Sequence, residues 1–269
     1  MPTDPLSNEL PEKYAATTAG LFGADKLDYW HAVVGRNVVD LDCRVANGNV
    51  FDASIEGVLL PGLNVWRIDA SPHSAVRGAS GIARSGSDSL VLNFVMSGRL
   101  YAEQDGRRVV LTAGDGALCD AERPYLLDLH ESVSIACVKL ARGALSSRAV
   151  GLQRATAIGF ESASTLCPLV FGYLVQLTES GARLTAPACD RAARNFTELL
   201  AAMVDEVVAA SPLPLSEYRA VALIRVKEFV ERHLSDSDFD SAMVATALKL
   251  SPRYINQLLE AEGTSLGRY

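Results

Sequence analysis

The sequence is poor in several features that would indicate particular kinds of site. Its 269 residues include only four histidines, His31, His73, His130 and His233, and no two of them lie at His-x-His spacing. The five cysteines are odd in number, widely spaced and never arranged as Cys-x-x-Cys. This spacing indicates neither a disulfide framework nor a zinc site, so we expect the cysteines to be buried free thiols.

Long hydrophobic runs and an excess of positive charge are also missing. No apolar stretch reaches the roughly 20 residues needed to cross a bilayer. The N-terminus has acidic rather than basic flanks, which does not match a signal peptide. The formal net charge of −7 argues against a protein that coats nucleic acid without sequence preference. Together these features predict a cytoplasmic protein with no membrane segment.

The overall composition indicates a folded protein. Hydrophobic residues make up 49% of the chain and charged residues 21%, and the length allows two domains. We predict an α+β multidomain fold. Residues 1–29 are expected to form an N-terminal arm, disordered over about its first twenty residues because these combine several prolines with scattered polar positions.

The segment from about residue 55 to 140 has the pattern of a β-sheet protein, with short runs of Val, Leu and Ile bounded by Gly, Asp and Pro. Asp105-Gly106 is a strong hairpin signal, and residues 113–116 predict a second tight reversal. Many short strands at close spacing indicate a double-sheet barrel or sandwich. The expected strands are 58–60, 63–70, 89–96, 100–104, 107–112, 116–120, 125–130 and 133–140.

Beyond residue 140 the hydrophobic spacing becomes helical. Residues 162–181 and 187–210 predict two amphipathic helices. We assign residues 146–214 to a helical region that either joins two protomers or packs onto its own barrel. Ser211-Pro212-Leu213-Pro214 is the best linker candidate. A third amphipathic helix over 215–234 would then open a C-terminal subdomain, 215–269.

Residues 240–262 (DSAMVATALKLSPRYINQLLEAE) predict two short helices joined by a tight turn. Ser251 is a favourable N-cap and Pro252 suits the first helical position, so the second helix should begin there. Arginine, asparagine and glutamine can each offer two hydrogen bonds to base edges in a DNA major groove. By pattern alone, a helical hairpin that merely packs on its neighbours fits equally well. The expected inward residues are Ile255, Leu258 and Leu259, and the expected outward residues are Arg253, Asn256 and Gln257.

The string VATALKLSPRYINQLLEAEGTSLGRY resembles the first helix-turn-helix of the AraC/XylS family of bacterial transcription regulators. The matching pieces are Val244-Ala245, Ser251-Pro252-Arg253-Tyr254 and Gly263-Thr264-Ser265. The resemblance implies that Arg253, Asn256 and Gln257 contact bases, while Ser251 and Tyr254 lie nearer the phosphates. Two positions depart from the family pattern: Lys249 stands where many relatives have glycine, and Leu259 replaces a frequent phenylalanine.

Members of this family normally continue into a bridging helix and a second helix-turn-helix, which this sequence does not contain. The chain is therefore expected to be truncated, as a fragment or as a shortened gene product. Two hypotheses follow from the resemblance. The first is a sequence-specific DNA-binding transcription regulator that responds to a small molecule. The second is a ligand-sensing and dimerisation module that does not bind DNA by itself.

The stretch SGRLYAEQDGRRVVLTAGDGALCDAERPYLL resembles the cupin-type sensor domain of many AraC-family regulators, in the subgroup called AraC-binding-like. The resemblance implies a cupin-like effector-binding domain over residues 30–145. Metal cupins place two or three histidines and a glutamate around one point. The sequence offers no such set, nor a nucleophile elbow or a phosphate-binding glycine loop, so we expect no metal, no cofactor and no enzymatic activity.

The interior of the expected barrel would then bind a small effector, because such pockets are mostly apolar with a few placed polar groups. Arg77 is the candidate for a carboxylate-bearing ligand, since a guanidinium pairs well with a carboxylate. In the alternative, the large side chains fill the core and Arg77 is solvated. The expected partners are promoter DNA, an effector of unknown identity and a second copy of the chain. The candidate pocket residues are Trp66, Arg77, Asn93, Phe94 and Tyr101.

Overall fold

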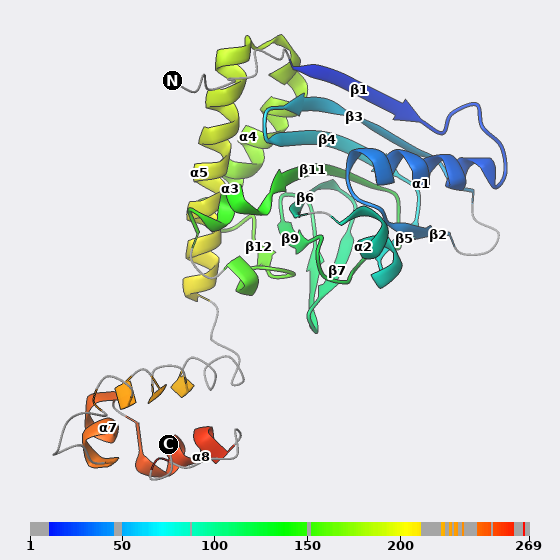
Figure 1. Ribbon diagram of the computed structural model, residues 1–269. Coiled ribbons are helices and arrows are strands. Elements are labelled where there is room, and N and C mark those ends of the chain that lie inside the picture. Colours follow the sequence, from blue (N-terminus) through cyan, green and yellow to red (C-terminus); the bar gives the residue numbers. More distant parts are fainter. Residues whose placement is uncertain are drawn as a thin grey trace, which may run out of the picture. The chain divides into compact units, whose positions relative to one another are not determined.

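The chain forms two compact units, Met1–Ala210 and Ser211–Tyr269, which are described separately (Figure 1). The structure is a computed structural model. The predicted linker, Ser211-Pro212-Leu213-Pro214, lies outside the described residues. The structure describes residues 11–45, 50–86, 88–149, 152–210, 222–223, 226–227, 229–230, 233, 241–248, 250–260 and 266.

Two antiparallel sheets form the barrel of the first unit, as expected for a cupin-like fold. The large sheet has the strand order β1-β3-β4-β11-β6-β9-β12, and the small sheet has the order β2-β5-β10-β7-β8. The strands are β1 (Glu12–Thr17), β2 (Asp42–Arg44), β3 (Ala53–Leu60), β4 (Leu63–Ala70), β5 (His73–Arg77), β6 (Ser89–Ser97), β7 (Leu100–Gln104), β8 (Arg107–Leu111), β9 (Gly116–Asp120), β10 (Tyr125–Leu129), β11 (Val133–Ala141) and β12 (Gly159–Phe160).

The large sheet is buried on both faces, so it contributes to two hydrophobic cores. Successive residues of a strand point to opposite faces. On β6, Val91 and Val95 face the barrel core between the sheets, while Leu90 and Leu92 face a second core. This explains why β6 is an almost continuous hydrophobic run in the sequence, without polar alternation.

Two helices cover the outer face of the large sheet, α4 (Cys167–Ser180) and α5 (Ala186–Ala210), and they lie side by side in Figure 1. Their apolar stripes, which include Leu174 of α4 and Phe196 and Leu200 of α5, are packed in the second core against their own sheet. The exposed Leu169 of α4 is an exception. The remaining elements of this unit are α1 (Asp25–Asn37), α2 (Ala79–Ser85), α3 (Arg142–Ser146) and two short 3-10 turns, η1 (Leu152–Arg154) and η2 (Gly181–Arg183).

The structure corrects the prediction for the N-terminal arm. Glu12–Thr17 is an ordered edge strand paired in register with β3, and Asp25–Asn37 is a helix whose Trp30 is buried in the barrel core. Periodicity did not indicate either element. The strand has only one neighbour and buries little of itself, and the partner that stabilises it lies about forty residues further along the chain.

The residue types at turns predicted the structure more reliably than hydrophobic periodicity did. Asp105 and Gly106 connect β7 to β8, and both have positive φ angles, 53° and 73°. A two-residue hairpin turn with positive φ at both positions favours an Asp-Gly pair, because glycine adopts this conformation freely and aspartate tolerates it. The predicted hairpin is confirmed.

The second unit contains α7 (Ser241–Leu248) and α8 (Pro252–Glu260). The described residues between 222 and 233 are helical, and Val226 and Val230 of that stretch pack with Val244 of α7 and with Ile255 and Leu259 of α8. Within the part of the chain that the structure describes, no helix is long and apolar enough to cross a membrane.

Candidate functional site

A small cavity lies inside the barrel, between the two sheets. Its volume is about 50 Å³, and its walls are mostly aliphatic side chains from α1 and from strands of both sheets. Three polar side chains, His73 of β5, Asn93 of β6 and Tyr125 of β10, also line it. The Nδ2 of Asn93 and the hydroxyl of Tyr125 are buried and have no hydrogen-bond partner in the protein. Burial raises the pKa of Tyr125 well above its usual value, so the hydroxyl keeps its proton and can donate.

Arg77, at the end of β5, is fully buried, so the solvated alternative does not hold. Its Nε donates to the carbonyl oxygen of Ala121 at 3.0 Å. Its Nη1 donates to the carbonyl oxygen of Asp40 and to Oγ of Ser85, both at 2.9 Å. These bonds tie together α2, the connection from α1 to β2 and the connection from β9 to β10. The Nη2 atom has no partner.

Trp66, Arg77 and Asn93 are the predicted pocket residues that the structure places in the barrel interior. Trp66 of β4 is completely buried in the barrel core, and its indole Nε1 has no hydrogen-bond partner. Trp66 and Asn93 are both directly opposite Cys137 of β11 in the strand register. Cross-strand neighbours share one face of a sheet, so both side chains belong to the inner face.

Phe94 and Tyr101 lie outside the barrel interior, which corrects the prediction for these two residues. Phe94 follows Asn93 in β6 and therefore faces outward, where its ring lies 5.4 Å from that of Phe171 in α4. Tyr101 is on the outer face of the small sheet, with its ring centroid 4.7 Å from that of His130. Adjacent strand residues cannot share a pocket, and this rule was available from the sequence.

Two further interior residues were not among the predicted pocket set. Tyr125 lies opposite Arg77 in the pairing of β10 with β5. Lys139 is two residues after Cys137 on β11 and is half-buried. Burial, together with the positive charge of Arg77, lowers the pKa of Lys139. Tyr125 could have been found from the alternation along residues 125–129, whereas the approach of Lys139 to Arg77 depends on two strands 62 positions apart.

The interior thiols are inert. Burial is the main cause that raises the pKa of Cys43, Cys119 and Cys137 to about 12 each, so these groups remain protonated. Among the described residues, no three His, Cys, Asp or Glu side chains lie close enough together to hold a metal ion.

The motif residues around Gln104 and Arg123 close one end of the barrel. Gln104 of β7 donates from Nε2 to the carbonyl oxygen of Asp120 in β9, and its Oε1 accepts from the Asp120 backbone N–H, both at 2.8 Å. These two bonds join the small sheet to the large one. Arg123 pairs with the carboxylates of Asp120 and Asp105, and Arg142 pairs with that of Asp120. The residues that carry the cupin resemblance therefore have a structural role here.

Asp120 predicts a measurable dependence of stability on pH. Burial opposes its ionisation, but hydrogen bonds from Arg142, the Glu122 backbone N–H and Arg123 outweigh burial and lower the pKa of Asp120. A carboxyl group whose pKa is lower in the folded state stabilises the fold fully at pH values above its unfolded-state pKa, which is near 4. This stabilisation is lost as the pH falls through the pKa of the folded state. Asp120→Asn should lower the free energy of unfolding by about 2 kcal/mol at pH 7.

Urea titrations of this variant from pH 7 to pH 3 should show a shallower loss of stability than the unmodified chain. Asp88→Asn is the matched control, because the exposed Asp88 contacts the same Arg142. Equal acid-side slopes for the Asp120 variant and the unmodified chain would contradict the assignment.

A larger hollow, of about 530 Å³, opens at one end of the large sheet and is lined mainly by hydroxyl side chains. Several of these hydroxyls are already used within the protein. Thr17 and Thr18 donate to the carbonyl oxygen of Ala53, and Oγ of Ser71 accepts from the Asp52 N–H. The polar groups of this hollow are those expected where the strands of a sheet end, and none of the described side chains that line it is a buried donor without a partner.

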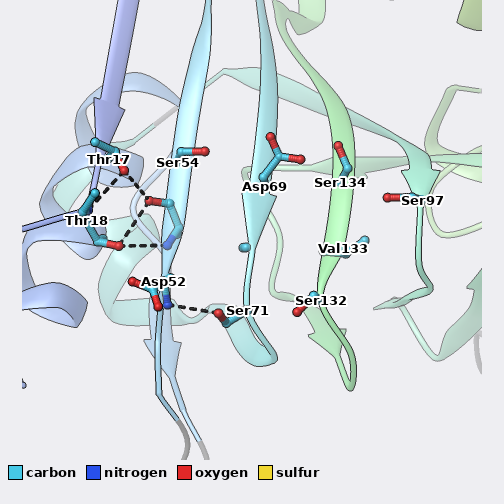
Figure 2. Close-up of a pocket in the computed structure, with 13 residues that line it drawn as sticks. Thr17, Thr18, Asp52, Ser54, Asp69, Ser71, Ser97, Ser132, Val133 and Ser134 are labelled. Carbon is cyan, nitrogen blue, oxygen red and sulfur yellow. Dashed lines mark hydrogen bonds between the residues drawn. The ribbon is translucent and has the colours of Figure 1, made fainter.

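Figure 2 shows a row of side chains at matching register positions on five neighbouring strands of the large sheet: Thr17, Ser54, Asp69, Ser134 and Ser97.

Helix α8 has the two-sided character that the sequence predicts. It begins at Pro252, and the Tyr254 N–H donates to Oγ of Ser251 at 3.2 Å, which is an N-cap. Ile255, Leu258 and Leu259 are buried against the rest of the unit. Ser251, Arg253 and Gln257 are exposed, and Tyr254 is partly buried.

Asn256 differs from the other expected DNA-contacting residues. It is partly buried, and its Oδ1 accepts a hydrogen bond from the backbone N–H of Leu266 at 3.3 Å. The acceptor of its amide group is therefore engaged within the unit. Arg253 and Gln257 are the side chains of the predicted trio that are exposed.

Comparison with known proteins places this fold in a family. Residues 30–204 match the AraC-binding-like domain. The chain is 28% identical over 218 residues to the transcriptional activator NphR of a Rhodococcus species, covering 80% of this chain and 64% of that protein. It is 24% identical over 249 residues to an uncharacterized protein in the nit 5′ region of Bacillus sp. (strain OxB-1), covering 90% of this chain and 95% of that protein.

Among solved structures, the AraC-like transcriptional activator CuxR superposes with a TM-score of 0.65 at 20% sequence identity, covering 95% of this chain and 91% of that one. The similarity to CuxR supports the fold alone. The match to the AraC-binding-like domain includes the small sheet, every strand of the large sheet except β1, and helix α4, and it ends within α5. The chain therefore belongs to the AraC-binding-like family, and the matched residues form its cupin-like barrel.

Proposed function

We propose that this chain is a transcription regulator that binds promoter DNA through α8 and responds to a small effector held inside the barrel. The observation that carries the DNA-binding part is the division of α8 into a buried face, Ile255, Leu258 and Leu259, and an exposed face with Arg253 and Gln257. A helix that reads DNA needs one side packed against its own domain and one side free to enter the major groove.

In this proposal Arg253 and Gln257 contact base edges and Asn256 positions the chain that follows α8. Arginine and glutamine can each make two hydrogen bonds to one base, which gives sequence discrimination. The hydrogen bond from the Leu266 N–H to Asn256 supports a positioning role for that residue. Ser251, which caps the helix, and Tyr254 are proposed to lie nearer the phosphates.

Strand β6 contacts both the cavity and helix α4, so it could transmit a structural change from one to the other. It presents Asn93 to the cavity and the next residue, Phe94, to Phe171 of α4. A ligand that displaces β6 would therefore shift the packing under α4, and an effector needs such a difference in contacts to favour one of two states. We propose that the chain acts as a homodimer, with the exposed Leu169 of α4 at the dimer contact.

Arg253→Ala is expected to weaken binding to DNA from upstream of the chain's own gene by about tenfold or more, because one bidentate base contact is worth about 1–3 kcal/mol. Fluorescence anisotropy titrations at low and moderate salt measure this effect. Arg108→Ala is the matched control. It removes the same charge from an exposed arginine of the barrel, which pairs with Glu103.

Equal losses in the two variants would mean that net charge, and not the face of α8, governs binding. If the unmodified chain shows no saturable binding at either salt concentration, DNA binding by this chain is refuted. Dimers that persist in sedimentation under those conditions would favour the alternative function, a ligand-sensing and dimerisation module.

A further inference from the structure

Four buried side-chain atoms of the barrel interior have no hydrogen-bond partner in the protein, and all four are donors. They are the Nε1 of Trp66, Nη2 of Arg77, Nδ2 of Asn93 and the hydroxyl of Tyr125. Each of these residues is less than 5% exposed. An unpaired buried donor is costly, so native proteins rarely keep even one without an acceptor. Four donors together indicate that the missing partner contributes acceptor atoms.

The four donors come from both walls of the barrel. Trp66 and Asn93 flank Cys137 on the inner face of the large sheet, and Tyr125 pairs with Arg77 on the small sheet. Asn93, Tyr125 and Cys137 line one cavity. Asn93 and Tyr125 therefore present donors from both walls to the same cavity. Arg77 does not line the cavity, but it is the cross-strand neighbour of Tyr125 on one face of the small sheet.

This region is also positively charged. Arg77 carries a guanidinium cation, and its charge, after the larger effect of burial, lowers the pKa of Lys139. The hydrogen bonds of Arg77 go to two backbone carbonyls and to one hydroxyl. Among the described residues, neither Arg77 nor Lys139 has a carboxylate within ion-pair distance. The buried guanidinium of Arg77 and the half-buried Lys139 therefore leave a positive charge that a ligand can balance.

We propose that the barrel cavity binds a small organic monocarboxylate whose oxygens accept hydrogen bonds from Asn93, Tyr125 and Arg77. This inference rests on the proposed function, because it names the chemical class of the effector. Aliphatic walls that include Val91, Leu100 and Ile135 suit an apolar body on the carboxylate rather than an inorganic anion. At about 50 Å³ the cavity has room for about three or four water-sized groups, which favours a short-chain acid.

Propionate is expected to raise the melting temperature of the isolated chain, and propionamide at the same concentration is expected to leave it nearly unchanged. The two molecules have similar shape, and only propionate carries the charge that Arg77 and Lys139 would balance. Acetate and benzoate extend the series in size. Chloride at matched ionic strength is the reference in every titration.

Tyr125→Phe separates ligand binding from stability. The Tyr125 hydroxyl has no hydrogen-bond partner in the protein. In the absence of ligand, the melting temperature of Tyr125→Phe should therefore equal or exceed that of the unmodified chain. In contrast, the dissociation constant for propionate, measured by isothermal titration calorimetry, should rise about tenfold, because one hydrogen bond to a charged group is lost. Tyr101→Phe removes the same atom from the outer face of the small sheet and should change neither quantity.

Three outcomes would overturn the proposal. The first is an equal change in melting temperature with propionate and with propionamide. The second is an unchanged dissociation constant for propionate in Tyr125→Phe. The third is no change in melting temperature with any acid from acetate to benzoate, in which case ordered water would be the partner of the four donors. All these measurements are made without DNA. A failure of DNA binding would therefore leave the carboxylate site standing, and a chain that binds DNA but no carboxylate would refute only the site.

Discussion

Gly57→Ala is expected to disrupt the barrel more than any other single-methyl change in the described part of the large sheet. Gly57 of β3 pairs with Trp66 of β4. A Cβ at this position would lie 2.0 Å from the carbonyl oxygen of Val65 and 2.8 Å from the Cα of Trp66. Both atoms belong to the backbone of a central strand, which is held on its other side by β11. No side-chain rotation can relieve these contacts, so the strand pair itself must move apart.

We expect the free energy of unfolding to fall by about 3 kcal/mol or more and the melting temperature to fall by about 10 °C. Circular dichroism melts of the purified chain measure this change. The matched control is Gly172→Ala in α4, where a Cβ meets no atom within 4 Å. Alanine should stabilise that helix by about 0.5–1 kcal/mol. Similar melting temperatures for the two variants would show that the β3–β4 pairing tolerates a methyl group.

Arg77→Met should produce the second large effect, a loss of about 3 kcal/mol of stability, because hydrogen bonds from a charged donor contribute about 1.5–3 kcal/mol each. Methionine fills much of the same volume but leaves the carbonyl groups of Ala121 and Asp40 without the donor that the guanidinium provides. Losing a buried charge and its unpaired Nη2 offsets part of this cost. The connection from α1 to β2 should loosen first, since Arg77 reaches it through the Asp40 carbonyl.

Arg84→Met is the control for this prediction, because Arg84 contacts the same residue, Asp40, through an exposed ion pair with its carboxylate. Exposed ion pairs contribute little to stability. Urea denaturation should therefore separate the two variants clearly. If Arg84→Met destabilised the chain as much as Arg77→Met, the anchoring role of the buried guanidinium would be refuted.

Elements whose stability is local were predictable. The Asp105-Gly106 hairpin, the Ser251-Pro252 start of α8 and the long helix α5 each depend on residues within a few positions of one another. Elements stabilised from a distance were missed or misjudged. β1 exists because β3 pairs with it, and β5, whose sequence His-Ser-Ala-Val-Arg is short and partly polar, exists because β10 and β2 flank it.

The same distinction between local and distant causes applies to the predicted pocket residues. Asn93 and Phe94 were both predicted to line the pocket, although the two-residue period of a strand allows only one of them to face inward. Arg77 was singled out by its chemistry and is buried, but the groups around it could not be anticipated. The three groups that hold it come from positions 40, 85 and 121, which the chain path brings together only after folding.

By itself, the sequence determined most strands of the two sheets, the helices that follow them and the capped C-terminal helix, because strand alternation, turn residues and helix caps act between near neighbours. Tertiary structure decided which side chains share the barrel interior, which apolar stripes are covered and which donors remain without partners. The physical reason is that burial and hydrogen-bond satisfaction depend on what the rest of the chain places around a residue.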